Sequence, residues 1–195
     1  MGPSTPEILK RVLAQRTRTT VADTTLMPAA VAVLLYPKDG DYCVLLNKRS
    51  DQVEHHKGEI SFPGGARDPE DQDFLATALR EVHEEMGINP SDVTVLGQLD
   101  DVVTRSRFGV RVFIGTIPYP YPFQPSNLEI AEVLEVPLSV LQSPGCLRQE
   151  SRWNGGRLET AYSYAYNKHL VFGATAKILQ QFLEVLDAGL KKEGH

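Results

Sequence analysis

The chain has 195 residues, of which 42% are hydrophobic and 23% charged, and its formal net charge is -5. These values fit a single globular domain with a full hydrophobic core, and the negative charge argues against a general nucleic-acid binder. No apolar run approaches the length of a membrane span, so we expect neither a membrane partner nor a signal peptide. The two cysteines, Cys43 and Cys146, form no metal or redox motif and indicate a reduced, cytoplasmic protein.

The first predicted element is a helix over residues 5–18. Thr5 is expected as its N-cap and Pro6 as its first helical residue, because an N-cap hydroxyl followed by proline is typical of a helix start. Its apolar side chains are expected to face inward: Ile8, Leu9, Val12 and Leu13. We expect residues 1–27 to form this helix and a polar lead-in, and residues 28–195 to form the main domain.

A β-hairpin is predicted next. Two apolar runs, residues 29–35 and 43–46, flank Asp39-Gly40, which is a turn signal. The second strand ends near Arg49, a cation that could contact an anionic ligand.

A loop before position 66 combines two histidines with two glycines. His55 and His56 are adjacent, and neighbouring residues of an extended chain point to opposite faces, so joint chelation of a metal is not expected. A structural or substrate-loop role is favoured for them. Gly64 and Gly65 end the loop, and glycine allows the tight turn and the close approach to a ligand that a side chain would block.

An amphipathic helix is predicted between Asp73 and Met86, ended by Gly87 in the left-handed conformation. Apolar residues at helical spacing mark its buried stripe: Leu75, Leu79, Val82 and Met86. The other face is expected to carry the charges of the helix.

Three carboxylates gather on one turn of this helix. Glu81, Glu84 and Glu85 stand at i, i+3 and i+4, so their side chains are neighbours, and we expect them on the face opposite the apolar stripe. Taken alone, this pattern is more often a solvated acidic face. Its combination with the glycine loop and with Arg80 favours a site for Mg²⁺ or Mn²⁺, which prefer carboxylate oxygens and bind substrate phosphates.

Two more strands are predicted after the helix, at residues 93–103 and 110–117, with Asp100-Asp101 near the end of the first. An arginine cluster lies between and within them: Arg105, Arg107 and Arg111. Such a cluster is usually solvated, but beside a diphosphate it would suit bidentate contacts to phosphate.

The last part of the chain predicts three segments. Residues 118–125 alternate proline and aromatic residues, so they form a stiff loop whose rings could flank a ligand. Residues 145–168 are typical of a β-hairpin, and a terminal helix with a buried apolar face opens at Phe172.

The segment from Gly65 to Ile88 resembles the Nudix box, usually written GX5EX7REUXEEXGU. Arg80-Glu81 and Glu84-Glu85 match its central and acidic pairs. The box position for glutamate holds Asp71 instead, and eight residues rather than seven separate it from Arg80. The helix is intact, so the extra residue belongs to the loop before it.

The region from residue 45 to 65 resembles the coenzyme A pyrophosphatase-type Nudix proteins, whose signature reads LLTxRSxxLRxHxGQxxFPGG. The matching residues are Leu45-Leu46, Arg49-Ser50, His56, Gly58 and Phe62-Pro63-Gly64-Gly65. The chain departs from the signature at Asn47, at Val53-Glu54 and at Glu59. Glu54 and Glu59 place negative charge near the expected site, which would disfavour a polyanion.

These resemblances imply an α/β fold, the Nudix-type α/β/α sandwich with a mixed sheet and a loop-helix-loop box. They imply a pyrophosphohydrolase that cuts coenzyme A or a derivative into phosphopantetheine and adenosine 3′,5′-bisphosphate. Another nucleoside diphosphate derivative as substrate, or a nucleotide-sensing module without turnover, stays open, as does a homodimer.

The resemblance also implies roles for single residues. Glu81, Glu84, Glu85 and the backbone carbonyl of Gly64 would hold the metal, and Arg80 would orient the glutamates. The general base would be a box glutamate such as Glu84, or Glu129 from a later loop. Substrate contacts are expected from these residues: Arg49, His56, Arg105 and Arg107.

Overall fold

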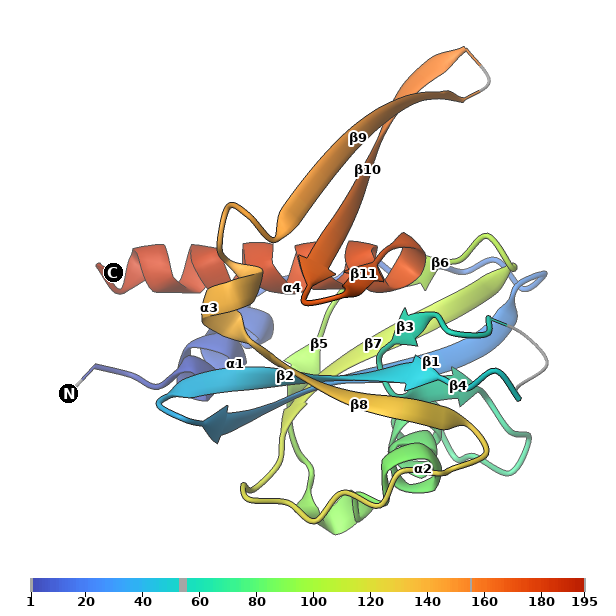
Figure 1. The fold of residues 1–195 in the computed structure, drawn as a ribbon, viewed down its shortest axis with the longest axis horizontal. Helices are drawn as coiled ribbons and strands as arrows, with labels where there is room; N and C mark the ends of the chain where they lie inside the picture. The colour runs from blue at the N-terminus through green and yellow to red at the C-terminus, as the bar shows by residue number, and fades with distance from the viewer. Residues whose placement is uncertain (1, 53–55, 155, 195) are drawn as a thin grey trace.

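A mixed β-sheet between two helical layers forms the body of the protein in the computed structural model, which describes residues 2–52, 56–154 and 156–194 (Figure 1). Strand β1 (Met27–Lys38) lies in the middle of this sheet. It is antiparallel to β2 (Asp41–Arg49) and parallel to β7 (Phe108–Thr116). The predicted hairpin of β1 and β2 is confirmed, with Asp39 and Gly40 both at positive φ in its turn.

The main order of the sheet is β3-β2-β1-β7-β5, and further short strands pair along its length. The remaining strands of the sheet are β3 (Ile60–Ser61), β4 (Gly64–Ala66), β5 (Thr94–Gln98), β6 (Val102–Val103) and β8 (Ile130–Pro137). Strand β4 pairs with the central strand β1, and the start of β8 pairs with the end of β2 at Arg49.

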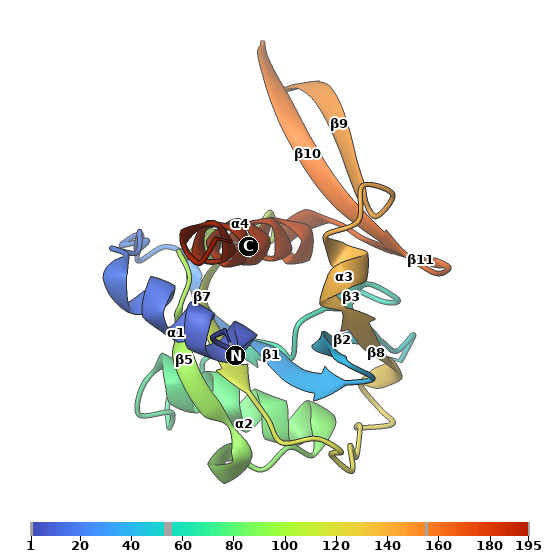
Figure 2. The same cartoon turned by 90° about the vertical axis from the view of Figure 1, so that its left-hand side faces the viewer.

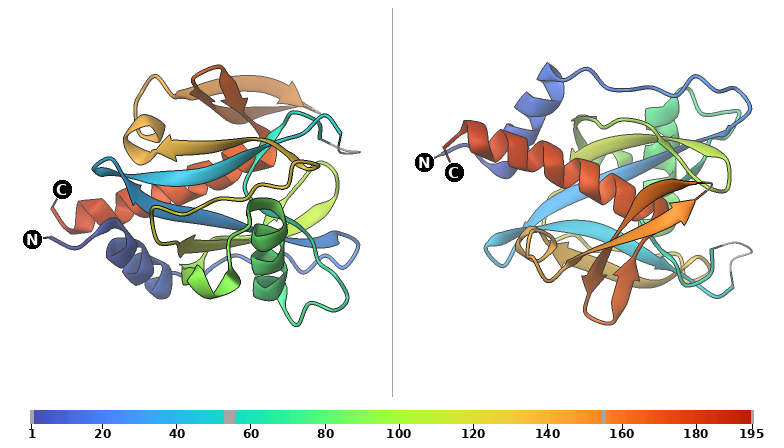
Figure 3. Two further views of the ribbon diagram at one scale, coloured as in Figure 1. Left: turned by 60° about the horizontal axis from the view of Figure 1, so that its bottom comes forward. Right: turned by 90° about the horizontal axis from the view of Figure 1, so that it is seen from above.

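Helices cover both faces of the sheet. Helix α2 (Phe74–Met86) lies on one face, and α1 (Thr5–Gln15) and α4 (Gly173–Lys192) lie on the other (Figure 3). A short 3₁₀ helix, η1 (Pro90–Asp92), precedes β5, and α3 (Leu138–Leu141) follows β8. This arrangement confirms the predicted α/β/α sandwich. None of the helices in the described part of the chain is long and apolar enough to cross a bilayer.

The first helix differs from its prediction at both ends. Its N-cap is Ser4 and not Thr5, and Glu7 accepts hydrogen bonds from the Ser4 amide at 2.7 Å and from the Ser4 hydroxyl at 2.8 Å. This capping box satisfies an N-terminal backbone donor, which explains the earlier start. The helix ends at Gln15, before residue 18.

The strand predicted at residues 93–103 is divided into β5 and β6. Between them Asp100 and Asp101 turn toward the lead-in segment, where Asp100 accepts from the Thr19 amide and Asp101 from the Val21 amide, both at 2.7 Å. The two aspartates therefore anchor residues 19–21 instead of continuing the strand.

The aromatic loop at residues 118–125 packs against the protein itself. Tyr119 stacks on Tyr36 with ring centroids 5.2 Å apart, and the Tyr121 hydroxyl donates to Asp92 at 2.8 Å. These rings and Phe123 cover an apolar cluster on the α2 side of the sheet. The loop is therefore part of the packed structure, and the expectation that these half-buried rings flank a ligand stays a prediction.

A hairpin arm projects from the body beyond α4 (Figures 1 and 2). It consists of β9 (Leu147–Asn154) and β10 (Arg157–Tyr166), which confirms the predicted hairpin, although Gly155 lies outside the described residues. A third strand, β11 (His169–Val171), was not predicted, because three residues are too short to show a period. Trp153 near the tip of the arm is 76% exposed.

Candidate active site

The buried face of helix α2 includes Val82 and Met86 of the predicted apolar stripe, but it extends to residues that the stripe does not contain. Asp73 is its N-cap and accepts from the Ala76 amide at 2.8 Å, while Gly87 ends it at φ 68°. The residues buried against the sheet are Thr77, Ala78, Val82, Glu85 and Met86. Glu85 is therefore on the buried face, and the expectation that all three glutamates share the open face is wrong.

Glu85 is the buried carboxylate of the site, with 1% of its surface exposed. Its Oε2 accepts from Asn47 Nδ2 at 3.0 Å and from the Gly64 amide at 3.1 Å, and Arg49 Nη1 lies 3.5 Å from its Oε1. Burial raises the pKa of Glu85 to about 8, and the negative charge of Glu81 adds to the shift. The Gly64 amide and the Arg49 cation offset only part of this rise.

The raised pKa makes a prediction for stability in metal-free solution. Since the folded state holds the Glu85 proton up to about pH 8 and the unfolded state releases it near pH 4.5, the folded state binds more protons between these values. The free energy of unfolding therefore falls as pH rises through this window. Glu85→Gln removes this loss, so its free energy of unfolding in EDTA should exceed that of the wild type by a margin that widens from pH 5 to 8 and reaches about 4 kcal/mol at pH 8, with a corresponding rise in Tm.

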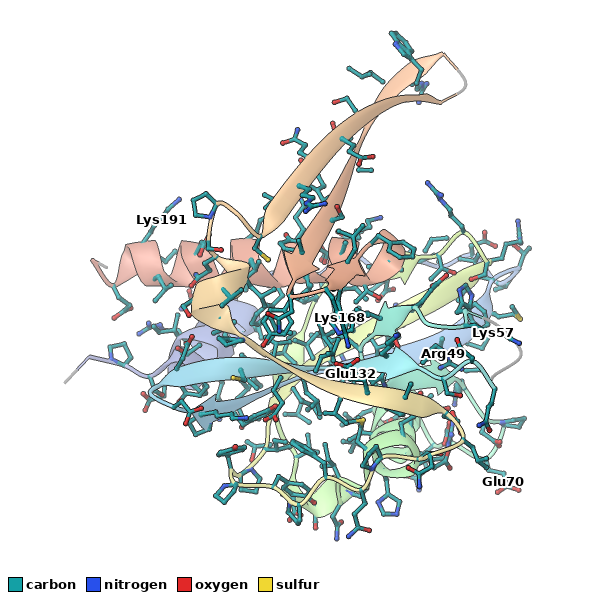
Figure 4. The ribbon with its side chains drawn as sticks, viewed as in Figure 1. Arg49, Lys57, Glu70, Glu132, Lys168 and Lys191 are labelled. Carbon is teal, nitrogen blue, oxygen red and sulfur yellow. The ribbon has the colours of Figure 1, made fainter. Side chains whose placement is uncertain are left out.

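Thermal melts at several pH values measure this margin. Glu70→Gln, which removes an exposed glutamate just before the same helix, controls for the loss of one charge (Figure 4). A margin for Glu85→Gln that stays constant from pH 5 to 8 contradicts the assignment.

The two glycines of the loop fit tightly against the glutamates and the sheet. Gly64 has φ 154°, and a Cβ there would come within 2.4 Å of the Ala30 carbonyl oxygen. A Cβ on Gly65 would lie 2.5 Å from Glu81 Oε1. Both positions therefore require glycine, as predicted, but a side chain would meet the backbone of β1 at Gly64 and the carboxylate of Glu81 at Gly65.

Arg80 holds the carboxylates of Glu81 and Glu84 in place. It donates to Glu81 Oε1 at 2.9 Å and to Glu84 Oε2 at 3.0 Å, and a bidentate pair with Asp71 at 3.0 and 3.1 Å fixes the guanidinium. Its donation to the Ala66 carbonyl ties the same group to the glycine loop. Hydrogen bonding to Arg80 holds the pKa of Asp71 well below its usual range.

Glu129 joins this site from the turn before β8. Its carbonyl accepts from the Ser50 amide at 2.7 Å, which fixes the turn beside the end of β2. Burial is the main cause of the raised pKa of both Glu81 and Glu85, and the negative charge of Glu129 adds a smaller contribution to each.

The donor set fits a divalent metal ion. Glu81 and Glu85 offer hard carboxylate oxygens, and burial raises the pKa of both, a cost that a cation would relieve. Within the described residues, no three His, Cys, Asp or Glu side chains surround one point. Glu81 and Glu84 point to Arg80 instead, so a cation would share or exchange these oxygens with the guanidinium.

The structure brings only some of the expected substrate residues to the glutamates. Arg49 contacts Glu85. The following loop, which carries Lys57, is tied to the end of β2 because the Gly58 amide donates to the Arg49 carbonyl (Figure 4). His56 Nδ1 lies 3.0 Å from Glu59 Oε2 in that loop. Val53, Glu54 and His55 lie outside the described residues, so the expectations for Glu54 and His55 stay predictions.

Arg105 and Arg107 belong to the turn between β6 and β7. Arg107 donates to Thr25 Oγ1 at 2.8 Å, and its carbonyl accepts from the Met27 amide. Since Met27 precedes the Gly65 partner Ala30 by three residues of β1, this turn lies about 10 Å along the sheet from the glycine loop. Contact between these arginines and a substrate stays a prediction.

Two residues of the site were missed as functional candidates. Asn47 interrupts the apolar run of β2, and this polar residue in a buried strand was an available signal. Asp71 was noted only as a variant of the box, yet it anchors Arg80. The one additional residue between Asp71 and Arg80, relative to the Nudix box, lies in the loop that brings Asp71 to Arg80.

Comparison with known proteins agrees with this geometry. The NUDIX domain family matches residues 26–141. Two bacterial proteins with the name "Uncharacterized Nudix hydrolase NudL" are similar over 141 residues, which is 72% of this chain. The one from Photorhabdus laumondii subsp. laumondii is 36% identical and covered over 75% of its length, and the one from Yersinia pestis (strain Pestoides F) is 33% identical and covered over 71%.

Solved structures share the fold. A MutT/nudix family protein from Enterococcus faecalis aligns with 96% of this chain and 76% of its own, with a TM-score of 0.54 and 17% identity. The NUDIX domain of Shewanella oneidensis NrtR, complexed with ADP ribose, aligns with 90% of this chain and 97% of its own, with a TM-score of 0.53 and 21% identity. The family match and the sequence relatives show that the chain belongs to the Nudix hydrolases, a family that acts on nucleoside diphosphate derivatives and generally uses divalent metal ions.

Proposed function

We propose that this Nudix hydrolase cuts the diphosphate of coenzyme A or a derivative, giving phosphopantetheine and adenosine 3′,5′-bisphosphate. The observation that carries the proposal is the fit of the two box glutamates against the glycine loop: the Gly64 amide donates to the buried Glu85 at 3.1 Å, and Gly65 lies directly against the carboxylate of Glu81. We propose Mg²⁺ or Mn²⁺ as the cofactor, held by Glu81, Glu84, Glu85 and the Gly64 carbonyl. Such an ion neutralises phosphate oxygens and makes water a better nucleophile.

The residues of the chain would divide the work among them. Arg80, fixed by Asp71, keeps Glu81 and Glu84 directed at the site. Glu129 is the candidate to accept the proton of the attacking water, with Glu84 as the alternative from the box. Arg49 is placed to contact a phosphate oxygen, because its guanidinium already lies beside Glu85.

The coenzyme A assignment rests on the loop from residue 45 to 65. The Arg49-Ser50 pair, His56, Gly58 and the glycine loop match the coenzyme A-type signature. Glu59, which departs from it, lies within hydrogen-bond distance of His56, so its charge has a neighbour that can offset it. Arg105 and Arg107 would meet the 3′-phosphate, a group that ADP-ribose lacks.

A comparison of substrates tests this assignment. The expected result is a higher kcat/KM for coenzyme A than for 3′-dephospho-coenzyme A or ADP-ribose, because each contact of an arginine with the 3′-phosphate is worth roughly 1–3 kcal/mol. Arg105→Gln and Arg107→Gln should reduce that ratio toward one while leaving the rate on ADP-ribose unchanged.

Lys191→Gln, an exposed cation at the far end of α4, is the matched charge control (Figure 4). A clear preference of the wild type for ADP-ribose would move the chain to the broader substrate class.

The same proposal places the enzyme in the cytoplasm. Cys43 and Cys146 are both free and buried in the structure, which suits a reducing compartment. A homodimer stays a prediction that sedimentation of the purified chain can test.

A further inference from the structure

Asn47 is an amide buried beside the most buried carboxylate of the site. No part of its surface is exposed, and it lies on β2 directly opposite Ser61 of β3. Its Nδ2 donates to Glu85 Oε2 at 3.0 Å, and its Oδ1 accepts from the Ser61 hydroxyl at 2.7 Å. The three side chains form one line of hydrogen bonds from the strand pair to the helix.

The bonds divide the two oxygens of Glu85 between different partners. Oε2 receives both neutral donors, Asn47 Nδ2 and the Gly64 amide, whereas Oε1 faces the cation of Arg49 at 3.5 Å. Two donors on one oxygen hold the carboxylate plane in one orientation, because rotation about its last bond would lengthen both hydrogen bonds. Oε1 is therefore the oxygen that remains directed at a cation.

We propose that Asn47 is a positioning residue for Glu85, which fixes the carboxylate so that Oε1 is presented to the divalent metal ion. The inference rests on the proposed function, because it assigns a role toward the same metal. Ser61 sets the direction of the amide: in the reverse orientation, Oδ1 would face Glu85 Oε2 and two acceptors would meet.

A purely structural role would look different. A buried asparagine that only completes the core would bond to backbone groups or to neighbours outside the site. Here Asn47 Nδ2 on β2 donates to the carboxylate of Glu85 on α2. Partners of this kind orient metal ligands, and their loss typically weakens metal binding about 10–100-fold.

The test measures Mn²⁺ binding to the full chain without substrate, from the EPR signal of free Mn²⁺. Asn47→Leu, which keeps the branched shape of the side chain and removes the donor, should raise the Mn²⁺ Kd about 10-fold or more. Ser61→Ala, which leaves Asn47 in place but frees its amide to turn, should raise it by a smaller factor. Leu45→Val is the matched control, since it reduces packing against α2 on the same face of β2, while neither side chain can hydrogen-bond to Glu85.

Activity gives the second readout. The Mn²⁺ concentration for half-maximal activity should rise in Asn47→Leu, while kcat at saturating Mn²⁺ should stay within a few fold of the wild type. A structural defect alone would lower the active fraction without moving the half-maximal concentration.

Each outcome decides something. Wild-type Mn²⁺ affinity in folded Asn47→Leu, or an equal loss in Leu45→Val, overturns the inference and leaves the proposed function standing. Wild-type affinity in Glu85→Gln removes the metal site itself and with it both proposals. If Asn47→Leu does not fold, Ser61→Ala decides: weaker Mn²⁺ binding supports the role of Asn47, and unchanged binding refutes it.

Discussion

Glu85→Gln is expected to lose hydrolysis by roughly 10²–10³-fold while the protein stays folded. The amide keeps an oxygen for the donors of Asn47 and Gly64, so the local packing is retained. It removes the negative charge that would hold the divalent ion. Steady-state hydrolysis with excess Mg²⁺ measures the loss, and circular dichroism confirms the fold.

Glu84→Gln serves as the graded comparison on the same helix. Its side chain is exposed and pairs with Arg80, so we expect a smaller loss than at Glu85 if its only role is to complete the metal shell. Wild-type turnover in Glu85→Gln, or in excess EDTA, is incompatible with metal-dependent hydrolysis at this site.

The two glycines of the loop should separate activity from folding. Gly65→Ala places a Cβ against the carboxylate of Glu81, the movable end of a side chain. The fold should accept it, but displacement of Glu81 by about 1 Å should reduce kcat/KM roughly 100-fold. Gly64→Ala instead meets the backbone of Ala30 and Val31 at positive φ, so it should cost about 3 kcal/mol, or roughly 10 °C in Tm.

Parallel melts and assays of both variants provide the check. Gly40→Ala, in the open turn between β1 and β2, is the control for a positive-φ glycine with nothing near its Cβ. Equal loss of stability in Gly64→Ala and Gly65→Ala would mean that the loop does not fit against the sheet and the glutamate in this way.

Local patterns in the sequence predicted most elements of the fold. The hairpin of β1 and β2, helix α2 and helix α4 follow from apolar periodicity and from turn or cap residues, all of which are local. Asp100 and Asp101 show where this fails, because their partners lie 80 residues away in the lead-in segment. No pattern within residues 93–103 carries that information.

Most members of the candidate site could be predicted from the sequence, but which of them are buried could not. The box spacing identified Arg80 and the three glutamates, yet a stripe of apolar residues cannot reveal a carboxylate that is buried for function, as Glu85 is. The role of Asn47 was harder still to predict, since it depends on hydrogen-bond partners in two other elements, α2 and β3. The pairing of His56 with Glu59 was not predictable either, and it bears on the proposed coenzyme A substrate because Glu59 departs from the coenzyme A-type signature.

The arm of β9 and β10 has a consequence for spectroscopy. The arm itself projects away from the body (Figure 1). The chain has one tryptophan, Trp153, which is exposed and pairs with Leu158 near the turn of the hairpin. Its indole is already surrounded by water in the native protein, so its emission should change little when the body unfolds. Tryptophan fluorescence would then suggest a stable protein while circular dichroism reports its melting. The same property makes Trp153 a selective reporter of anything that docks on the arm, through a blue shift or through protection from acrylamide quenching.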